Sequence, residues 1–266
     1  MPDAGGAPEA PMVLNETRGG VACLTLNRGP KRNPLSRAML AALADALDAA
    51  AEDVDVRCVV LRAEGPAFSA GHDLKEVRAN PDRAFYEQLM RQCSHVMTRI
   101  VRLPKPVIAA VEGVATAAGC QLVASCDLAV AGADARFATP GVNIGLFCST
   151  PMVALSRSVS SKHAMEMLLL GDMIDAETAF RFGLVNRVAP AGEATAAATE
   201  LALKIASKSQ MTLRVGKAAF YRQQEMGLDD AYAYASEVMT TNLLARDAEE
   251  GIDAFIQKRE PKWEDR

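Results

Sequence analysis

The chain has few aromatic side chains, little net charge and no long apolar run. Aromatic residues make up 5% of its 266 residues and hydrophobic residues 50%, so an aliphatic core is expected, as in many α/β proteins. A formal net charge of −4 argues against a surface for nucleic acid or an anionic membrane, although local Lys and Arg side chains still allow a small polyanionic ligand. The longest apolar runs, such as residues 107–110 and 168–170, fall far short of the roughly 20 residues of a bilayer span. No nucleic-acid or membrane partner is therefore expected.

The six cysteines form neither a C-x-x-C pair nor a cluster with histidines. Most of them lie in apolar stretches, which favours buried, reduced thiols over a disulfide framework. The spacing gives no zinc site, and no metal or prosthetic group is expected. These residues are Cys23, Cys58, Cys93, Cys120, Cys126 and Cys148.

Residues 1–11 are rich in Gly, Pro and Ala. They lack both the apolar core of a signal peptide and the arginines of a transit peptide. The sequence therefore predicts a disordered tail on a cytoplasmic protein.

Short apolar strands alternate with amphipathic helices along the first half of the chain. Strands are expected at residues 21–26, 57–62, 107–111 and 128–131. Helices are expected between them, one marked by apolar residues at three- and four-residue steps: Met39, Leu40, Leu43 and Leu47. The alternation predicts an α/β fold of strand–helix–strand units with right-handed crossovers.

A longer helix is expected to begin at Asn80, with Asn as its cap and Pro81 in its first turn. After Pro151 the pattern changes to nearly continuous helix, at residues 160–170, 175–182, 194–207, 211–226, 228–244 and 247–258. Apolar faces on these helices favour contacts between subunits. The alternative is an ordinary helical layer that covers the sheet.

Two turns rich in Gly and Ala each lie between a predicted strand and a predicted helix. Residues 68–76 read FSAGHDLKE, and residues 115–121 read ATAAGCQ. Small residues let a ligand approach the main chain, and a helix start offers unpaired N–H groups and the positive end of a dipole. The amides of Ala70 and Ala118 are the candidates for an oxyanion hole, in which two N–H groups bind one oxygen. The alternative is a pair of ordinary packed loops.

Several ordered strings resemble the crotonase, or enoyl-CoA hydratase/isomerase, superfamily from about residue 13 to residue 263. They are residues 26–35 (LNRGPKRNPL), 68–76, 105–113 (KPVIAAVEG), 117–127 (AAGCQLVASCD), 137–140 (FATP) and 176–186 (AETAFRFGLVN). The chain is most similar to a divergent subgroup, the enoyl-CoA hydratase domain-containing proteins, in His72, Gln121, Gly141 and the run 147–151. The resemblance implies a crotonase-like spiral of ββα turns over residues 12–200. It also implies a helical trimerisation region over residues 201–266.

The resemblance implies an acyl-CoA thioester as ligand, with coenzyme A as part of the substrate, and a homo-trimer or a dimer of trimers. The thioester carbonyl oxygen would be bound by two main-chain amides, which match Ala70 and Ala118. The coenzyme A body would be contacted by Lys31, Arg32, Ser69, Asp73, Leu74, Lys75, Phe255 and Lys258. Phe255 and Lys258 would close the pocket, and either the same chain or a neighbouring subunit would supply these two residues. The alternative for each charged group alone is a solvated surface position.

The resemblance fails at the positions that activate water. Hydratases of this family use two glutamates, and the matching residues here are Gln121 and Gly141. Neither exchanges a proton near neutral pH, and a general acid or base contributes about 10²–10⁴-fold, so ordinary hydration is expected to be weak or absent. Restoring both glutamates is expected to recover some hydration. His72 is the candidate substitute acid or base, against the alternative of a loop histidine that contacts coenzyme A or solvent.

Three functions stay open at this point. The first is an enzyme that stabilises the enolate of an acyl-CoA, nominally a hydratase or isomerase. The second is a non-catalytic acyl-CoA-binding or regulatory homo-oligomer, and the third is a structural trimer without ligand. Asp73 is also interpreted as an acceptor for loop amides, Cys148 as a buried thiol, and Glu112 as a weak alternative carboxylate.

Overall fold

Three consecutive turns of the chain each place one strand in a large sheet and the next strand in a small sheet before a helix follows. The computed structural model describes residues 10–266. The strand pairs are β3 (Cys58–Ala63) with β4 (Ala67–Ser69), β5 (Val107–Val111) with β6 (Val114–Thr116), and β7 (Leu128–Gly132) with β8 (Arg136–Ala138). This arrangement confirms the spiral of ββα turns.

The large sheet has six strands in the order β1-β2-β3-β5-β7-β10, with β1 (Val13–Arg18), β2 (Val21–Leu26) and β10 (Arg187–Ala189). All its neighbours are parallel except β1 and β2. The small sheet has the order β4-β6-β8-β9, where β9 (Ile174–Asp175) is antiparallel to β8. Because β4, β6 and β8 are parallel, their carboxyl ends lie at one edge of the small sheet.

Most core helices match the predicted ones, but the helix at residues 149–158 was not predicted and the long third helix begins later than expected. Asp82 caps that helix by accepting a hydrogen bond from the Phe85 N–H at 2.9 Å, whereas Asn80 follows the end of the preceding helix. The predicted cap at Asn80 is therefore wrong. The core helices are α1 (Arg37–Glu52), α2 (Leu74–Ala79), α3 (Arg83–Arg102), α4 (Ala118–Ser125), α5 (Ser149–Ser158), α6 (Ser161–Leu170), α7 (Ala176–Phe182) and α8 (Ala194–Ala206), with short 3-10 helices η1 (Gly29–Lys31) and η2 (Pro140–Ile144).

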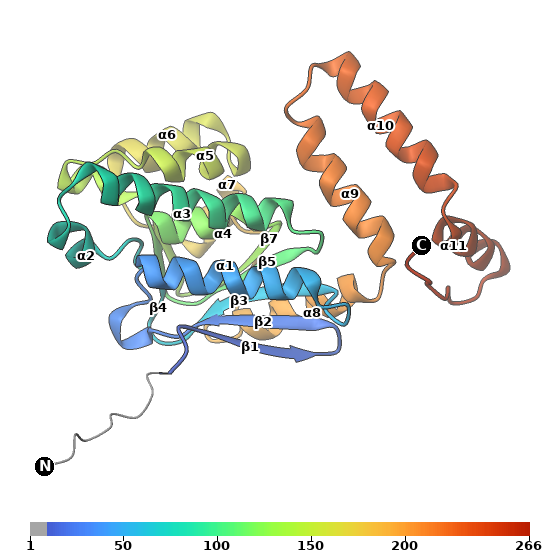
Figure 1. The fold of residues 1–266 in the computed structure, drawn as a ribbon, viewed down its shortest axis with the longest axis horizontal. Coiled ribbons are helices and arrows are strands. Elements are labelled where there is room, and N and C mark those ends of the chain that lie inside the picture. The colour runs from blue at the N-terminus through green and yellow to red at the C-terminus, as the bar shows by residue number, and fades with distance from the viewer. Residues whose placement is uncertain (1–9) are drawn as a thin grey trace, which may run out of the picture.

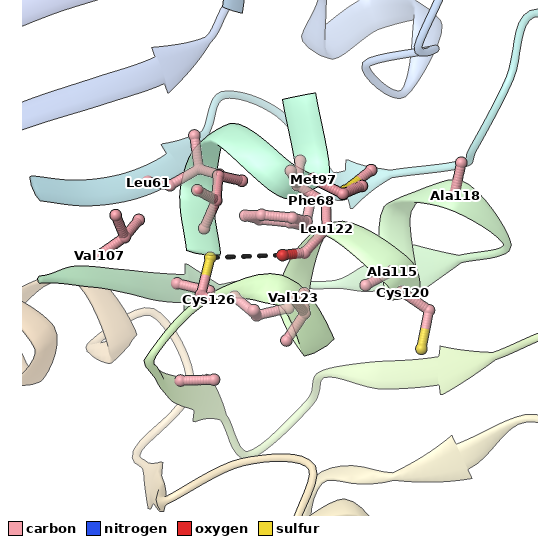
Figure 2. Packing of buried hydrophobic residues seen from close by; sticks show 14 of the residues in the cluster. Leu61, Phe68, Met97, Val107, Ala115, Ala118, Cys120, Leu122, Val123 and Cys126 are labelled. Atoms are coloured by element: carbon pink, nitrogen blue, oxygen red, sulfur yellow. Dashed lines mark hydrogen bonds between the residues drawn. The ribbon is translucent and has the colours of Figure 1, made fainter. Parts of the chain in front are cut away.

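Two aliphatic clusters hold these layers together. The larger one fills the space between the two sheets and α1, α3 and α4, and Figure 2 shows its packing around Phe68, Leu122 and Val123. The smaller one joins the outer face of the large sheet to one stripe of α8, formed by Ala194, Ala198, Ala202 and Ala206. All cysteines but Cys23 are buried, and all six are free thiols, as predicted.

Residues 207–266, called the arm here, leave the core as three helices. These are α9 (Gln210–Gln223), α10 (Leu228–Leu243) and α11 (Arg246–Gln257), and Figure 1 shows α9 and α10 extending away from the sheets. Neither α9 nor α10 contains a buried residue. The boundary expected at residue 200 lies inside α8, which packs on the large sheet, so the arm begins after α8.

The N-terminal end of the described part is tied to the core. The carbonyl oxygens of Ala10 and Pro11 accept hydrogen bonds from the Arg28 guanidinium, and residues 1–9 of the predicted tail lie outside the described residues. From residue 10 to residue 266, the chain forms no helix that is long and apolar enough to span a bilayer.

Candidate functional site

The segments that follow β4, β6 and β8 meet at one edge of the small sheet. The Ala117 N–H donates to the Ala138 carbonyl oxygen at 2.9 Å, which joins the chain after β6 to the end of β8. A Cβ atom at Gly71 would lie 3.0 Å from the Thr116 oxygen and 3.3 Å from the Ala118 nitrogen, so the loop after β4 lies against the start of α4. Gly71 itself has a φ of +87°, a conformation that favours glycine. The two predicted turns therefore lie side by side.

The main-chain amide of Ala118, a residue that is only 1% exposed, has no hydrogen-bond partner in the described chain. Ala118 is the first residue of α4, and no group in the described part of the chain accepts its N–H. The preceding residue, Ala117, adopts φ 49° and ψ −119°, which is unusual for a residue with a side chain. No side chain caps this helix start, so its positive end faces the site.

The other predicted amide is already used. The Ala70 N–H donates to the Arg32 carbonyl oxygen at 3.0 Å, which corrects the prediction that Ala70 offers the second free donor. The Gly71 N–H is bound by the Ser69 hydroxyl at 3.2 Å. Between these bonds and α2, the His72 N–H has no acceptor among residues 10–266. His72 thus carries a main-chain N–H without a partner directly after Gly71, the residue of this loop that adjoins Ala118.

The side chain of His72 is held in one orientation. Its Nδ1 lies 3.0 Å from the Leu35 carbonyl oxygen, and because a carbonyl only accepts, Nδ1 carries the proton and Nε2 is the acceptor. Nε2 is buried and has no partner within the described chain. Burial lowers the pKa of His72, although the Leu35 hydrogen bond and the charge of Glu76 act in the opposite direction. The imidazole is therefore neutral at pH 7, with a free lone pair on Nε2.

Gln121 lies on the first turns of α4 and is only 4% exposed. Its Oε1 accepts a weak hydrogen bond from the Cys93 thiol at 3.8 Å, and burial raises the pKa of that thiol to about 12. Figure 2 places Ala118 and Cys120 on the same short helix as Leu122, which packs in the core. Gln121 thus lies one helical turn after Ala118 on α4, and the hydrogen bond that its side chain accepts comes from a thiol.

Gly141 lies in η2, directly after the end of β8, and is buried. A Cβ atom at this position would lie 2.5 Å from the Leu146 carbonyl oxygen and 2.9 Å from the Cys148 sulfur. Burial raises the pKa of the Cys148 thiol, and a hydrogen bond from the Gly141 amide opposes that shift. Cys148 is therefore a protonated thiol at neutral pH, in agreement with its interpretation as a buried thiol.

Comparison with known proteins decides the family. The family model described as enoyl-CoA hydratase/isomerase matches residues 16–266. The chain belongs to the enoyl-CoA hydratase/isomerase family. It is 48% identical to the enoyl-CoA hydratase domain-containing protein 3, mitochondrial, of Rattus norvegicus over 258 residues, which cover 96% of this chain and 86% of the rat protein. It is also 48% identical to the Homo sapiens protein of the same name over 244 residues, covering 92% of this chain and 80% of the human protein.

Solved structures of family members share the fold. A crystal structure of an enoyl-CoA hydratase from Mycobacterium smegmatis has a TM-score of 0.92 and 53% identity, and covers 95% of this chain and 99% of that chain. The structure of human enoyl coenzyme A hydratase domain-containing protein 3 also has a TM-score of 0.92, with 47% identity over 95% of this chain and 100% of that chain. The crotonase fold is thus confirmed.

The expectation of a cytoplasmic protein is contradicted by these relatives. The rat, mouse and human proteins that match this family member over nearly its whole length are all named as mitochondrial. The expectation was based on the composition of residues 1–11. A stretch without a leader pattern does not identify the compartment of the protein.

The residues expected around coenzyme A fall into three groups. Lys31, Arg32, Leu74 and Lys75 are exposed near the loop that follows β4. The Ser69 side chain is fully buried, donates to the Asn33 carbonyl oxygen at 2.8 Å and accepts from the Gly71 amide, so its predicted contact with coenzyme A is corrected to a structural role. The Ser69 hydroxyl thus links the main chain at Asn33 to the main chain at Gly71.

Asp73 is the N-cap of α2, and Glu112 binds the start of α8. The Asp73 carboxylate accepts from the Lys75 and Glu76 amides at 2.9 and 3.2 Å and starts α2, as the interpretation as a loop acceptor expected. The Glu112 carboxylate accepts from the Ala194 amide at 2.8 Å and the Gly192 amide at 3.2 Å before α8. Glu112 is therefore not a free carboxylate for the site.

Phe255 and Lys258 lie at the end of the arm, on and just after α11. Figure 1 places α11 at the opposite side of the molecule from α2, so a single chain does not bring these residues to the site. Phe255 is 85% exposed. It lines an apolar hollow of about 310 Å³ between α10 and α11, together with Met239, Leu243, Gly251 and Ile252.

Sequence reasoning missed Asn33. Its side chain is fully buried, donates to the carbonyl oxygens of Glu64 and Ala67 at 2.8 Å each, and accepts from the Arg28 amide at 2.7 Å. Its φ of 48° is one that Asn tolerates better than most residues. The Asn-Pro pair was the available signal, since Asn before Pro marks a turn.

No group of three or more His, Cys, Asp or Glu side chains within residues 10–266 is placed to hold a metal ion.

Proposed function

We propose that this protein binds an acyl-CoA thioester and holds its carbonyl oxygen between the main-chain N–H groups of Ala118 and His72. One observation carries the proposal: two amides without a partner in the described chain lie on adjoining segments, since the loop that contains Gly71 approaches the Ala118 nitrogen at the start of α4. Preorganised donors of this kind act where negative charge develops on an oxygen. The family membership of the chain supports a thioester as the source of that oxygen.

The site suits an enolate better than it suits water addition. Two N–H groups and the positive end of α4 stabilise an oxyanion without any proton transfer. Water addition also needs acid–base groups, and the residues at the two matching positions are a carboxamide, Gln121, and a glycine, Gly141. Ordinary hydration by this protein is therefore weak or absent in this proposal.

His72 is the acid–base group that we propose for any remaining proton transfer. It belongs to the same loop as the second amide, and its neutral Nε2 has a lone pair with no partner in the described chain. A base that acts near neutral pH needs such an unprotonated nitrogen. This role gives the protein a route to move a proton of the acyl group without a carboxylate.

The second candidate function is a non-catalytic acyl-CoA-binding or regulatory homo-oligomer. The observation that favours it is the burial of His72 Nε2, since a group in the wall of the site reaches the ligand only after a shift of the loop. In this case the amide pair binds the thioester and no bond changes.

The assembly that we propose is a homo-trimer or a dimer of trimers formed through the arm. Helices α9 and α10 bury no residue of their own, and they expose Phe220, Tyr232, Met239 and Leu243. A second copy would cover this surface and bring Phe255 and Lys258 near a neighbouring site. Light scattering at several protein concentrations tests the assembly.

Titration calorimetry with a panel of acyl-CoA thioesters tests the binding proposal, and crotonyl-CoA turnover tests the chemistry. The proposal expects binding of acyl-CoA and a hydration rate at least about 10²-fold below that of a hydratase with both glutamates. Absence of any binding contradicts the proposal. Hydration at an ordinary rate contradicts the part that concerns Gln121 and Gly141.

A further inference from the structure

The position of the second family glutamate is closed by main chain in this protein. Gly141 is buried, and a Cβ atom there would approach the Leu146 carbonyl oxygen to 2.5 Å and carbon to 3.3 Å. Real side chains do not tolerate a contact of 2.5 Å, and a main-chain oxygen cannot rotate aside as a side chain does. Position 141 thus has no room for any side chain unless residue 146 moves.

Residue 146 is held where it is. The Leu146 N–H donates to the Gly141 carbonyl oxygen at 2.9 Å, and Gly145 makes the reversal with φ +78°. The other side of the turn packs on the end of α6, where a Cβ atom at Gly171 would lie 2.9 Å from a Val142 methyl carbon. The Asn143 side chain also donates to the Gly171 carbonyl oxygen, at 3.4 Å. These contacts fix the turn at both faces.

Two groups occupy the space beside Gly141. One is the Leu146 carbonyl oxygen, which accepts no hydrogen bond in the described chain. The other is the Cys148 sulfur, 2.9 Å from the position of a Cβ at Gly141. Neither a carbonyl nor a protonated thiol removes a proton from water at neutral pH. The turn therefore replaces a water-activating group with two groups that do not activate water.

We propose that residues 140–148 form a fixed plug that fills the position of the second carboxylate. The plug restricts the site to acyl thioesters that either bind without reacting or exchange a proton of the acyl group, in both cases without addition of water. The inference rests on the proposed acyl-CoA site and extends it. Gly141 is the specificity-determining residue, because the Leu146 carbonyl oxygen leaves room only for a residue without a side chain at this position. This changes the expectation from the sequence that glutamates at 121 and 141 restore hydration.

The steric part is tested by thermal unfolding of Gly141→Ala beside a matched control, Gly216→Ala. Gly216 is exposed within α9, and a Cβ atom there meets nothing within 4 Å. The plug predicts that Gly141→Ala lowers the Tm by about 5 °C, as overpacking does in a chain of this size. Gly216→Ala leaves the Tm unchanged or raises it, since Ala favours a helix over Gly. An unchanged Tm for Gly141→Ala overturns the plug.

The chemical part is tested with Gln121→Glu and with the double variant Gln121→Glu/Gly141→Glu in the full-length protein. Both are expected to hydrate crotonyl-CoA no faster than the unmodified protein. A gain of about 10²-fold or more in Gln121→Glu, which does not disturb the turn, overturns the proposal. The same gain in a double variant that keeps its Tm also overturns it.

Failure of the underlying site is distinguishable from failure of the plug. If the unmodified protein binds no acyl-CoA in calorimetry, the proposed function is wrong while the Tm difference between Gly141→Ala and Gly216→Ala still stands. If acyl-CoA binds and Gly141→Ala keeps its Tm, the plug alone is wrong.

Discussion

Lys217 Nζ donates to Asp127 Oδ2 at 2.6 Å, and this pair anchors the arm to the core. The Lys217 ammonium also donates to the carbonyl oxygens of Ile100 and Lys105, at 2.9 and 3.0 Å. The other carboxylate oxygen of Asp127 accepts from the Tyr221 hydroxyl at 2.9 Å. The two side chains of the ion pair are only 7% and 16% exposed. Since Asp127 follows α4 by two residues, the second half of α9 is tied to the helix that starts at the Ala118 amide.

Lys217→Met is expected to lower the free energy of unfolding by about 3 kcal/mol, because it leaves the partly buried Asp127 carboxylate without its counter-charge. Urea unfolding at one fixed protein concentration measures this, since assembly contributes to apparent stability. Arg83→Met is the control: the Arg83–Glu87 pair is exposed on α3, and its loss is expected to cost less than about 1 kcal/mol. Equal losses for the two variants would contradict the anchor.

His72→Asn is expected to flatten the pH dependence of stability below pH 6.5. Burial lowers the pKa of His72 in the folded protein from its ordinary value of 6.5. As the pH falls below 6.5, the unfolded chain takes up a proton that the folded chain does not, so stability decreases. Above pH 6.5 both states are neutral and the contribution is constant. The Asn side chain keeps a donor for the Leu35 carbonyl oxygen.

Unfolding free energies between pH 5 and pH 7, compared for wild type and His72→Asn, measure the contribution of His72 to the pH dependence of stability. The control is His95→Asn on α3, where the histidine is exposed. The same slope in wild type and in His72→Asn would show that the imidazole is not held neutral by burial.

Asn33→Ala is expected to destabilise the protein by about 3 kcal/mol and to weaken acyl-CoA binding. The change removes three hydrogen bonds, those to the Glu64 and Ala67 carbonyl oxygens and the one from the Arg28 amide, and a buried polar group that loses its partner costs about 1–3 kcal/mol. Asn33→Asp keeps one acceptor and loses both donors, so it tests which contacts matter. Calorimetry with butyryl-CoA beside urea unfolding gives both readouts, and an unchanged affinity would separate Asn33 from the site.

Ala117→Gly is expected to raise the free energy of unfolding by about 1 kcal/mol. A residue with a side chain at φ 49° and ψ −119° stores about 1–3 kcal/mol of strain, which glycine relieves at a cost of about 0.4–1 kcal/mol in chain entropy. Ala124→Gly inside α4, the helix that follows Ala117, is the control, with an expected loss of about 0.5–1 kcal/mol. A loss of equal size in both variants would mean that Ala117 is not strained.

The sequence alone predicted the parts of the fold that depend on long apolar patterns. The strands at 21–26 and 107–111 begin and end where they were expected, and so nearly do the arm helices. Strands β4, β6 and β8 were not predicted, because three residues are too few to show an alternating pattern. The same limit explains Asn80, where two good caps lie two residues apart and only tertiary packing selects Asp82.

The site shows why local sequence identifies a loop but not its free donor. The turn at 68–76 is evident from its small residues. Which of its amides is free depends on Arg32, a residue distant in sequence whose carbonyl oxygen accepts the hydrogen bond from the Ala70 N–H. Gly141 is similar: its sequence position shows a missing carboxylate, and only the structure shows that the Leu146 carbonyl oxygen fills the place.

The most direct test of the amide pair is the infrared stretching frequency of the thioester carbonyl in [1-¹³C]butyryl-CoA bound to the protein. Two N–H donors at one oxygen polarise the carbonyl, so the account predicts a frequency clearly below that of the same thioester free in water. Binding of butyryl-CoA with the carbonyl frequency unchanged would contradict the account, because the oxygen would then lie away from the Ala118 and His72 amides.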